Sequence, residues 1–143
     1  MQWNIFLVHF IVPILVLSTV NLNSAFLATD QNITVTGQLA CDRKAVQHAE
    51  IELREHDPAD PDDLLNTTTS DRMGHFSVFG HDDEIFSVAP YVRIIHNCDG
   101  GRINPSCIII DEIKVPKHLI GGTYNMGIVS LNIVRDNHKK DCH

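Results

Sequence analysis

The chain has 143 residues, of which 11 are Lys or Arg and 18 are Asp or Glu, so its formal net charge at pH 7 is −7. Nucleic-acid backbones are bound by clustered positive charge, and the sequence has no basic stripe interleaved with aromatic residues. This excludes a typical nucleic-acid-binding protein, and the length fits a single domain.

The N-terminus carries one apolar block, residues 5–20, followed by small residues that include Ala25 and Ala28. The block is shorter than the roughly 20 apolar residues of a membrane span, and polar residues and a proline interrupt it. We predict a secretory signal peptide over residues 1–28, cleaved near residues 25–28, and no membrane span in the mature chain, residues 29–143. An uncleaved anchor and a buried N-terminal helix are the alternatives. The predicted location is secreted, in the extracellular region or at the cell surface.

The first half of the predicted domain consists of strands separated by turns. Residues 32–40 and 48–55 alternate apolar with polar side chains, which predicts two half-buried strands. Acidic residues and two prolines in residues 57–63 predict a loop, and residues 67–69 favour a short extended segment. A tight turn at residues 71–74, with Gly74 at its end, leads to a strand in which Phe76 and Val78 face the core. We expect residues 80–84 to end that strand.

The second half continues the pattern. Residues 91–96 and 107–115 are the most apolar stretches, and the loop between them predicts a hairpin. Residues 124–134 predict one long or two short strands, and residues 135–143 a polar tail. Since no amphipathic helix of ten or more residues is evident, we predict an all-β fold. Its expected form is an antiparallel, Greek-key β-sandwich of about seven strands with little helix.

Four cysteines are candidates for disulfides in an exported chain: Cys41, Cys98, Cys107 and Cys142. They form no CxxC pair and lack the spacing of a zinc cluster, which favours structural bridges over redox or metal roles. Because Cys98 and Cys107 flank the predicted hairpin loop, a local bridge is favoured, with Cys41 joined to Cys142. Four cysteines allow three connectivities, and the sequence does not choose among them.

Two sequons, Asn-Ile-Thr at Asn32 and Asn-Thr-Thr at Asn66, are candidate N-glycosylation sites. Each lies at a predicted strand border or loop, where an oligosaccharide stays solvated. An unmodified surface asparagine is the alternative at both positions.

No catalytic motif emerges from the remaining polar residues. Eight histidines are dispersed along the mature chain, so we predict scattered surface side chains and no metal site: His48, His56, His75, His81, His96, His118, His138 and His143. The acidic loop lacks the Gly and the terminal Glu of an EF-hand, which favours a solvated loop over a Ca²⁺ site formed by Asp57, Asp60, Asp62 and Asp63. Serine-hydrolase, nucleotide-binding and cysteine-protease motifs are absent. We expect no catalytic residue and no cofactor.

A series of short motifs resembles a known group of proteins. They are Val35-Thr36-Gly37-Gln38-Leu39-Ala40-Cys41, Pro61-Asp62-Asp63-Leu64-Leu65, Thr69-Ser70-Asp71-Arg72-Met73-Gly74-His75-Phe76, Ile94-Ile95-His96-Asn97-Cys98 and Asp141-Cys142-His143. In order and spacing they resemble the transthyretin-like family of secreted nematode proteins, over nearly the whole mature chain. The resemblance implies a transthyretin-type β-sandwich, secretion, an extracellular or cell-surface location, and two-bridge cysteine pairing.

The same resemblance has limits. Thyroid-hormone transport belongs to the tetramer of vertebrate transthyretin, and nothing in this sequence indicates such an assembly. Hydroxyisourate hydrolases resemble the same fold but end in Tyr-Arg-Gly-Ser, whereas this chain ends in Lys140-Asp141-Cys142-His143. The hydrolase signature is therefore absent.

Our leading hypothesis is a non-enzymatic secreted binding module that holds an extracellular protein or lipid partner through its loops or an exposed sheet edge. Residues 57–65 and 99–104 are the candidate contact loops, with plain connectors as the alternative. A carrier of small hydrophobic ligands, which requires an apolar cavity, is the second hypothesis. A hydroxyisourate-hydrolase-type enzyme is the third. The sequence leaves the partner and the oligomeric state open.

Overall fold

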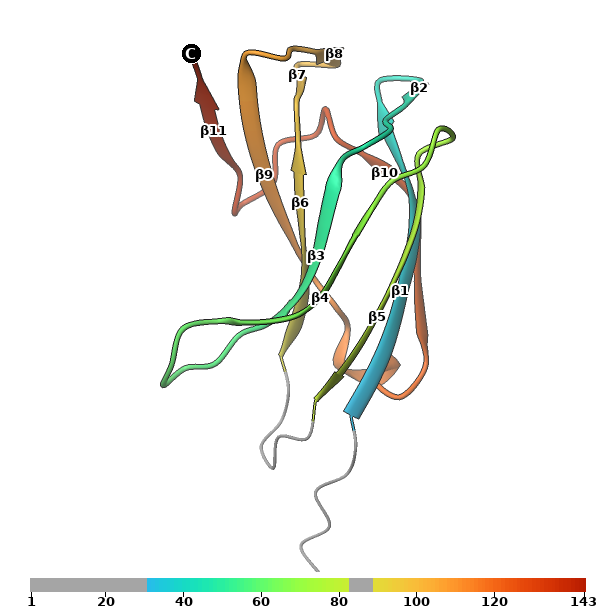
Figure 1. Cartoon of the computed structure of the whole chain (residues 1–143), viewed down its shortest axis with the longest axis vertical. Coiled ribbons are helices and arrows are strands. Elements are labelled where there is room, and N and C mark those ends of the chain that lie inside the picture. The colour runs from blue at the N-terminus through green and yellow to red at the C-terminus, as the bar shows by residue number, and fades with distance from the viewer. Residues whose placement is uncertain (1–30, 83–88) are drawn as a thin grey trace, which may run out of the picture.

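A computed structural model of the chain describes residues 31–82 and 89–143. The predicted signal peptide, residues 1–28, lies outside the described residues, as do residues 83 and 84 of the predicted strand ending. The described strands form two facing layers, a β-sandwich, as Figure 1 shows. This confirms the predicted all-β class.

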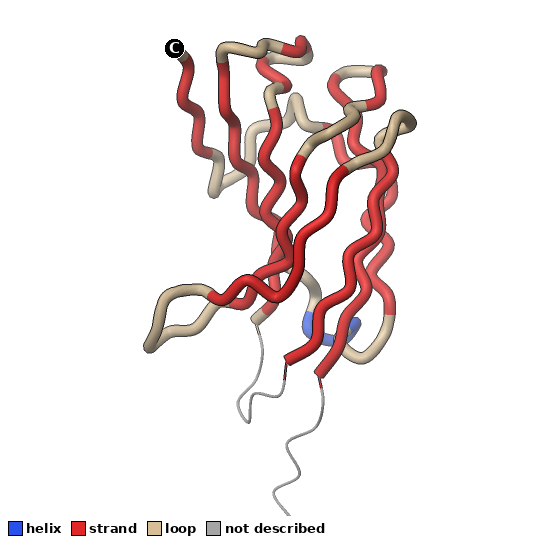
Figure 2. Tube along the Cα trace, viewed as in Figure 1, coloured by secondary structure: helices blue, strands red, loops and turns tan. Residues whose placement is uncertain are grey.

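One layer is built around the first strand. Strand β1 (Gln31–Cys41) has β10 (Thr123–Ser130) as one neighbour, and it also pairs with β5 (His75–Asp82) and β2 (Lys44–Ala45). The other layer has five strands in the order β11 (Lys139–Cys142), β9 (Cys107–Lys114), β6 (Pro90–His96), β3 (Glu50–Glu55) and β4 (Asp63–Thr69). A separate two-stranded ladder joins β7 (Cys98–Asp99) to β8 (Arg102–Ile103). A single 3₁₀ turn, η1 (Lys117–Leu119), lies between β9 and β10 and is the blue segment of Figure 2.

The core lies between the layers and follows from the alternation along the strands. Val35, Ile51, Leu53, Val92 and Ile94 are each 0% exposed. Burying a side chain of this kind stabilises the fold by about 1.5–3 kcal/mol. Phe76 and Val78, which follow the tight turn, were predicted to face the core, and both are buried.

The tight turn before β5 depends on its glycine. Gly74 has φ of 80°, in the left-handed region that side chains rarely adopt. A Cβ atom there would also collide with the carbonyl oxygen of Leu39. The predicted tight turn at residues 71–74 is confirmed, and the N–H of Gly74 closes it by donating to the carbonyl of Asp71 at 2.9 Å.

The strand count of about seven was too low, since the described residues contain eleven strands. The additional ones are the two-residue strands β2, β7 and β8 and the C-terminal β11. Strand β11 lies in the segment predicted to be a polar tail, and all four of its residues are exposed. A strand that pairs through its backbone at a sheet edge needs no apolar face, so the composition did not reveal it.

The purely antiparallel arrangement was also wrong in one place. Strand β10 runs parallel to β1, with Thr34 opposite Thr123 and Ala40 opposite Ser130. Alternation along a strand reports which face is buried but not the direction of the neighbouring strand. Within the described residues, no helix is long and apolar enough to cross a membrane.

Candidate functional site

All four cysteines are bonded, as Cys41–Cys98 and Cys107–Cys142. The favoured local bridge between Cys98 and Cys107, and with it Cys41 to Cys142, was therefore wrong. Continuing the β6–β9 register past its last pair, His96 with Ile109, would place Cys98 opposite Cys107. The ladder ends at that pair, however, because the chain starts β7 at Cys98.

The observed bridges have different roles. Cys41 ends β1 in one layer. Cys98 is 2% exposed and starts β7, directly after β6 of the other layer, and both cysteines belong to the core. The first bridge therefore links the two layers. Cys107 and Cys142 are partners in the β9–β11 ladder, so the second bridge fastens the C-terminal strand to the five-stranded sheet.

An unpredicted polar cluster inside the sandwich supports the same C-terminal segment. The carboxylate of Asp111 on β9 is 0% exposed and accepts hydrogen bonds from His96 Nε2 at 3.0 Å and from His138 Nδ1 at 2.8 Å. Arg135 Nη1 lies 3.3 Å from the same carboxylate. The main-chain N–H of Cys98 donates to His96 Nδ1, so the ring proton of His96 sits on Nε2 and is directed to Asp111.

The charge of this buried carboxylate is stabilised by its neighbours. Burial by itself would raise the pKa of Asp111, but the hydrogen bonds from His96 and His138 outweigh it, and the pKa is lowered. Because the donors come from β6 and from the segment before β11, the cluster holds the chain's last residues against the sheet.

The prediction that all eight histidines are scattered on the surface was wrong for His96. The period of two contains the missing signal, since His96 has the same parity as Val92 and Ile94 on β6. Asp111 likewise shares the parity of the buried Ile109 on β9. A histidine and an aspartate on the inward faces of paired strands indicate a buried hydrogen-bonded pair.

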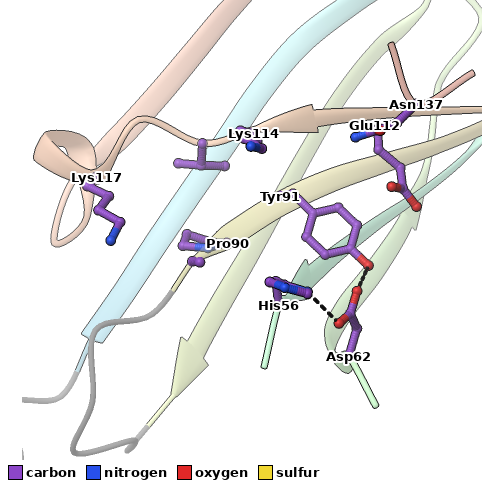
Figure 3. A pocket seen from close by; sticks show the side chains of 10 residues that line it. His56, Asp62, Pro90, Tyr91, Glu112, Lys114, Lys117 and Asn137 are labelled. Atoms are coloured by element: carbon purple, nitrogen blue, oxygen red, sulfur yellow. Dashed lines mark hydrogen bonds and ion pairs between the residues drawn. The ribbon is translucent and has the colours of Figure 1, made fainter. Parts of the chain in front are cut away.

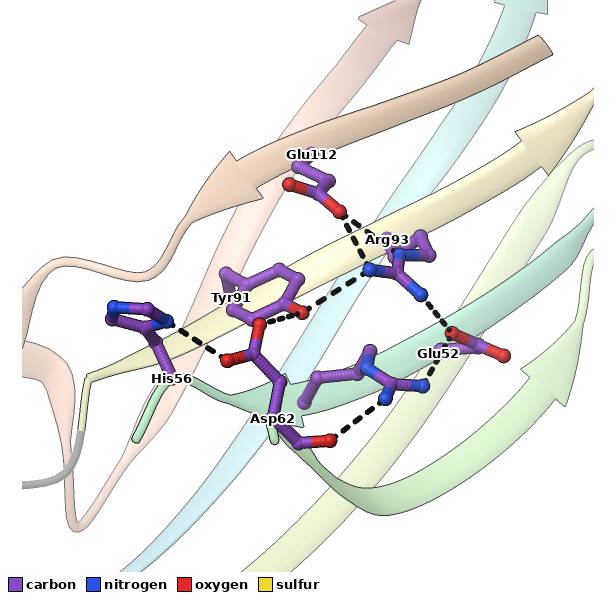
Figure 4. Close-up of polar contacts among 7 residues, drawn as sticks. Glu52, His56, Asp62, Tyr91, Arg93 and Glu112 are labelled. Carbon is purple, nitrogen blue, oxygen red and sulfur yellow. Dashed lines mark hydrogen bonds and ion pairs between the residues drawn. The ribbon is translucent and has the colours of Figure 1, made fainter. Parts of the chain in front are cut away.

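The outer face of the five-stranded sheet carries a second polar cluster, drawn in Figure 4. The register places Glu52 of β3 opposite Arg93 of β6, and Arg93 opposite Glu112 of β9. Arg93 Nη2 lies 2.8 Å from Glu112 Oε1, and Arg93 Nη1 lies 3.5 Å from Glu52 Oε2. Three strands thus share one row of alternating charge, which fixes Arg93 between two carboxylates.

The row continues to the loop before β4. Arg54 donates from Nη1 to Glu52 at 3.0 Å and from Nη2 to the main-chain oxygen of Asp62 at 2.8 Å. The Tyr91 hydroxyl donates to Asp62 Oδ2 at 2.7 Å, and His56 Nδ1 lies 2.9 Å from Asp62 Oδ1. The guanidinium of Arg93 sits 5.9 Å from the centre of the Tyr91 ring. The phenol is therefore held in one orientation.

These contacts set the protonation states of Tyr91 and Asp62. Burial, together with the hydrogen bond to Asp62, raises the pKa of Tyr91 to about 12. Hydrogen bonds from Tyr91 and then from His56 lower the pKa of Asp62. At neutral pH the phenol is protonated and the carboxylate is charged, so the pair is a fixed donor and acceptor.

A pocket of about 520 Å³ opens beside this cluster, where β6 begins and β9 ends. Figure 3 shows His56 and Asp62 at one side, Tyr91 and Pro90 along the wall, and Lys117 at the opposite side. Its volume falls within the range of small-molecule sites, about 300–1,000 Å³.

Comparisons with known proteins show which family the chain resembles. Residues 36–116 match the model of the transthyretin-like family. Transthyretin-like protein 16 of Caenorhabditis elegans is 43% identical over 112 residues, covering 78% of this chain and 83% of that protein. The chain belongs to the transthyretin-like family. Transthyretin-like protein 5 of the same organism is 29% identical over 136 residues, covering 90% of this chain and 96% of that protein.

Among solved structures, part of a 9R-lipoxygenase from Cyanothece is similar at 22% identity and a TM-score of 0.43, covering 71% of this chain and 16% of that chain. The predicted resemblance to the transthyretin-like family is confirmed by the family match and by the relatives.

The two predicted glycosylation sites of this transthyretin-like chain lie on different layers. Asn32 is half-buried on β1, whereas Asn66 is exposed on β4. The side-chain amide of Asn66 donates to the carbonyl of Phe79 at 2.6 Å, and its oxygen accepts from the Thr67 N–H at 2.8 Å. Glycosylation at either position stays a prediction.

The carboxylates of the predicted acidic loop, residues 57–65, have separate surroundings. Asp57 accepts from the N–H of Ala59 at 2.7 Å, Asp62 belongs to the outer cluster, and Asp63 already starts β4. The loop therefore ends earlier than predicted, and its main role in the described structure is to deliver Asp62 to Tyr91.

The second predicted contact loop, residues 99–104, is partly ordered by the β7–β8 ladder. Lys140 of β11 donates to Asp99 at 2.7 Å. The side-chain ligand atoms of Asp99, Cys107 and Cys142 lie within 4.8 Å of one another, but both sulfurs are in a disulfide and offer no thiolate. This grouping does not suit a metal ion.

Proposed function

We propose that this chain is a secreted, non-enzymatic binding protein of the extracellular space or cell surface. We further propose that it contacts a protein or lipid partner through the outer face of its five-stranded sheet. The observation that carries the proposal is the row of fixed side chains on that face, from Glu112 through Arg93 and Glu52 to the Asp62–Tyr91 pair. Side chains that are already held in place lose little conformational freedom when a partner binds.

The chemistry of the same residues favours binding over catalysis. A general acid or base works best when its pKa lies near the operating pH. The pKa of Tyr91 is raised to about 12 and that of Asp62 is lowered, so both are shifted away from neutrality. Tyr91 therefore keeps its proton and Asp62 its negative charge across the physiological pH range.

Two further observations support an extracellular role. The N-terminal segment has the pattern of a signal peptide, and two disulfides stabilise the described domain. Bridges of this kind persist in oxidising compartments.

The proposal is tested by immobilising the oxidised mature chain, residues 29–143, and capturing partners from extracellular extract or from vesicles. We expect the double variant His56→Ala/Lys114→Ala to lose the captured partner. The matched control is His75→Ala/Lys44→Ala on the other sheet, because the side chains of His56 and His75 are 62% and 58% exposed. Equal capture by both variants would exclude the outer face as the binding surface.

A carrier of small hydrophobic ligands is the second candidate, and the pocket of about 520 Å³ favours it. An enzyme acting on hydroxyisourate is the third, and a direct assay decides it. Turnover at enzyme-like rates would overturn the non-enzymatic proposal.

A further inference from the structure

The pocket at the end of the outer face has an uneven distribution of charge. Its two carboxylates are already engaged, since Asp62 accepts from Tyr91 and Glu112 pairs with Arg93. Lys114 and Lys117 also line it, and neither ammonium has a hydrogen-bond or ion-pair partner among residues 31–82 and 89–143. In a chain of net charge −7, the pocket therefore presents two ammonium groups without a partner in the described structure, beside two carboxylates that are already bonded.

The remaining wall of the pocket is apolar and fixed. Pro90 and Val115 are buried beneath it, and the N–H of Val115 donates to the carbonyl of Pro90 at 2.9 Å. The ring of Tyr91 forms one side, held by its hydroxyl bond to Asp62 and by the guanidinium of Arg93 over its face. A ligand with a flat apolar body would therefore meet a surface that does not have to reorganise.

We propose that this pocket binds a small amphipathic anion: a ring or short chain of apolar atoms that carries one carboxylate or sulfonate. The apolar body lies against Tyr91, Pro90 and Val115, and the anionic group is held by Lys114 and Lys117. Each ammonium has three donors, and a hydrogen bond between charged groups is about twice as strong as a neutral one. The assignment deepens the second proposed function and rests on it, since it gives the carried ligand a charge and a location.

The two lysines lie on consecutive elements that border the pocket. Lys114 is the last residue of β9 and Lys117 the first of η1, so the chain turns around the pocket between them. Both are exposed, so the ligand's charge stays near water and pays little desolvation penalty.

The test uses two fluorescent probes that share an aromatic body and differ in one group. Anilinonaphthalene sulfonate carries the anion, and N-phenylnaphthylamine is the neutral counterpart. We expect saturable binding of the sulfonate to the oxidised mature chain, weakened about tenfold or more in Lys114→Gln/Lys117→Gln, as loss of charged hydrogen bonds predicts. Binding of the neutral probe should change by less than about twofold, since its contacts are apolar.

The matched control is Lys44→Gln/Lys139→Gln, which removes the same charge from two exposed lysines that do not line the pocket. It should keep the affinity of the wild-type chain for the sulfonate. Amide chemical shifts that change around Tyr91 and Lys114 on adding the sulfonate would place the probe in the pocket.

Several outcomes would overturn the proposal: no saturable binding of the sulfonate, equal weakening in both lysine pairs, or equal loss of both probes in the pocket variant. Unfolding curves of each variant exclude a general loss of structure. Sulfonate binding by the wild-type chain together with equal macromolecular capture by the outer-face variant and its control would overturn the outer-face partner alone. Capture that persists without sulfonate binding would overturn only the anion site.

Discussion

The five-stranded sheet holds two carboxylates with similar partners and opposite surroundings. Asp111 inside the sandwich accepts from His96 and His138, and Asp62 at the outer face accepts from Tyr91 and His56. Both pKa values are lowered, yet the side chain of Asp111 is 0% exposed and that of Asp62 is 29% exposed. The comparison shows that burial, more than the set of partners, separates a structural cluster from one that can meet a ligand.

Replacing Asp111 and Asp62 in turn should give the largest difference in the free energy of unfolding. We expect Asp111→Ala to lower the free energy of unfolding by about 3–5 kcal/mol, because it leaves the buried His96 and the half-buried Arg135 without their partner. Asp62→Ala should lower it by much less, since water replaces the lost contacts there. Urea unfolding monitored by fluorescence and circular dichroism checks both. Equal losses would contradict the comparison.

Removing the disulfide beside Asp111 should have the next largest effect on the free energy of unfolding. The Cys107–Cys142 bridge spans 35 residues, so Cys107→Ser/Cys142→Ser should cost about 2–4 kcal/mol in free energy of unfolding. Hydrogen exchange should show early loss of protection in β11, while β3 keeps its protection. Removing Cys41 and Cys98 is the control, because that bridge joins the end of β1 to the start of β7 and does not involve β11. Unchanged protection of β11 would show that Asp111 and its partners hold the strand alone.

Acid should weaken the inner cluster. The folded pKa of Asp111 is lowered below its unfolded value, so the unfolded chain binds more protons. The stabilisation is present above about pH 4 and is lost as the pH falls through the folded pKa. Urea unfolding at decreasing pH should therefore show a smaller pH dependence in Asp111→Asn than in the wild-type chain. The same slope in both would assign acid sensitivity to other carboxylates.

The smallest expected effect is the ionisation of Tyr91, in the outer cluster, at alkaline pH. One tyrosine should ionise near pH 12 in the folded chain, and Tyr91→Phe should remove that step from the ultraviolet titration. Because the pKa is raised, its stabilisation is present below about pH 10 and is lost as the pH rises toward the folded value. Asp62→Asn should shift the step to lower pH, as one of its causes is removed. An unshifted step would mean that burial alone sets the pKa.

The sequence predicted what depends on local periodicity. The alternation around Ile51 and Leu53 predicted β3, and the apolar runs on either side of the loop predicted the β6–β9 hairpin. The same alternation placed Glu52 and Arg54 on the outer face, although it did not reveal which residues they meet. Register across three strands, which only the fold supplies, assembles the row with Arg93.

Features that depend on distant pairing were missed. Cys98 was paired with its neighbour across the hairpin because nothing local indicates that the ladder ends at His96. The residues of β11, Lys139–Cys142, form a strand only because β9 offers a free edge, and the Tyr91–Asp62 contact requires a loop to fold back over 29 positions. Such choices are made by tertiary contacts and leave no periodic trace.

The parallel ladder between β1 and β10 has a consequence for how the chain assembles. Thr34 pairs with Thr123, so this edge of β1 can pair only when a segment 89 positions farther along the chain is available. Contacts of such long sequence separation slow folding, because loop closure precedes any gain from pairing. A nascent chain would therefore expose the β1 edge until β10 has emerged, and a chaperone that covers this edge would matter most in that interval.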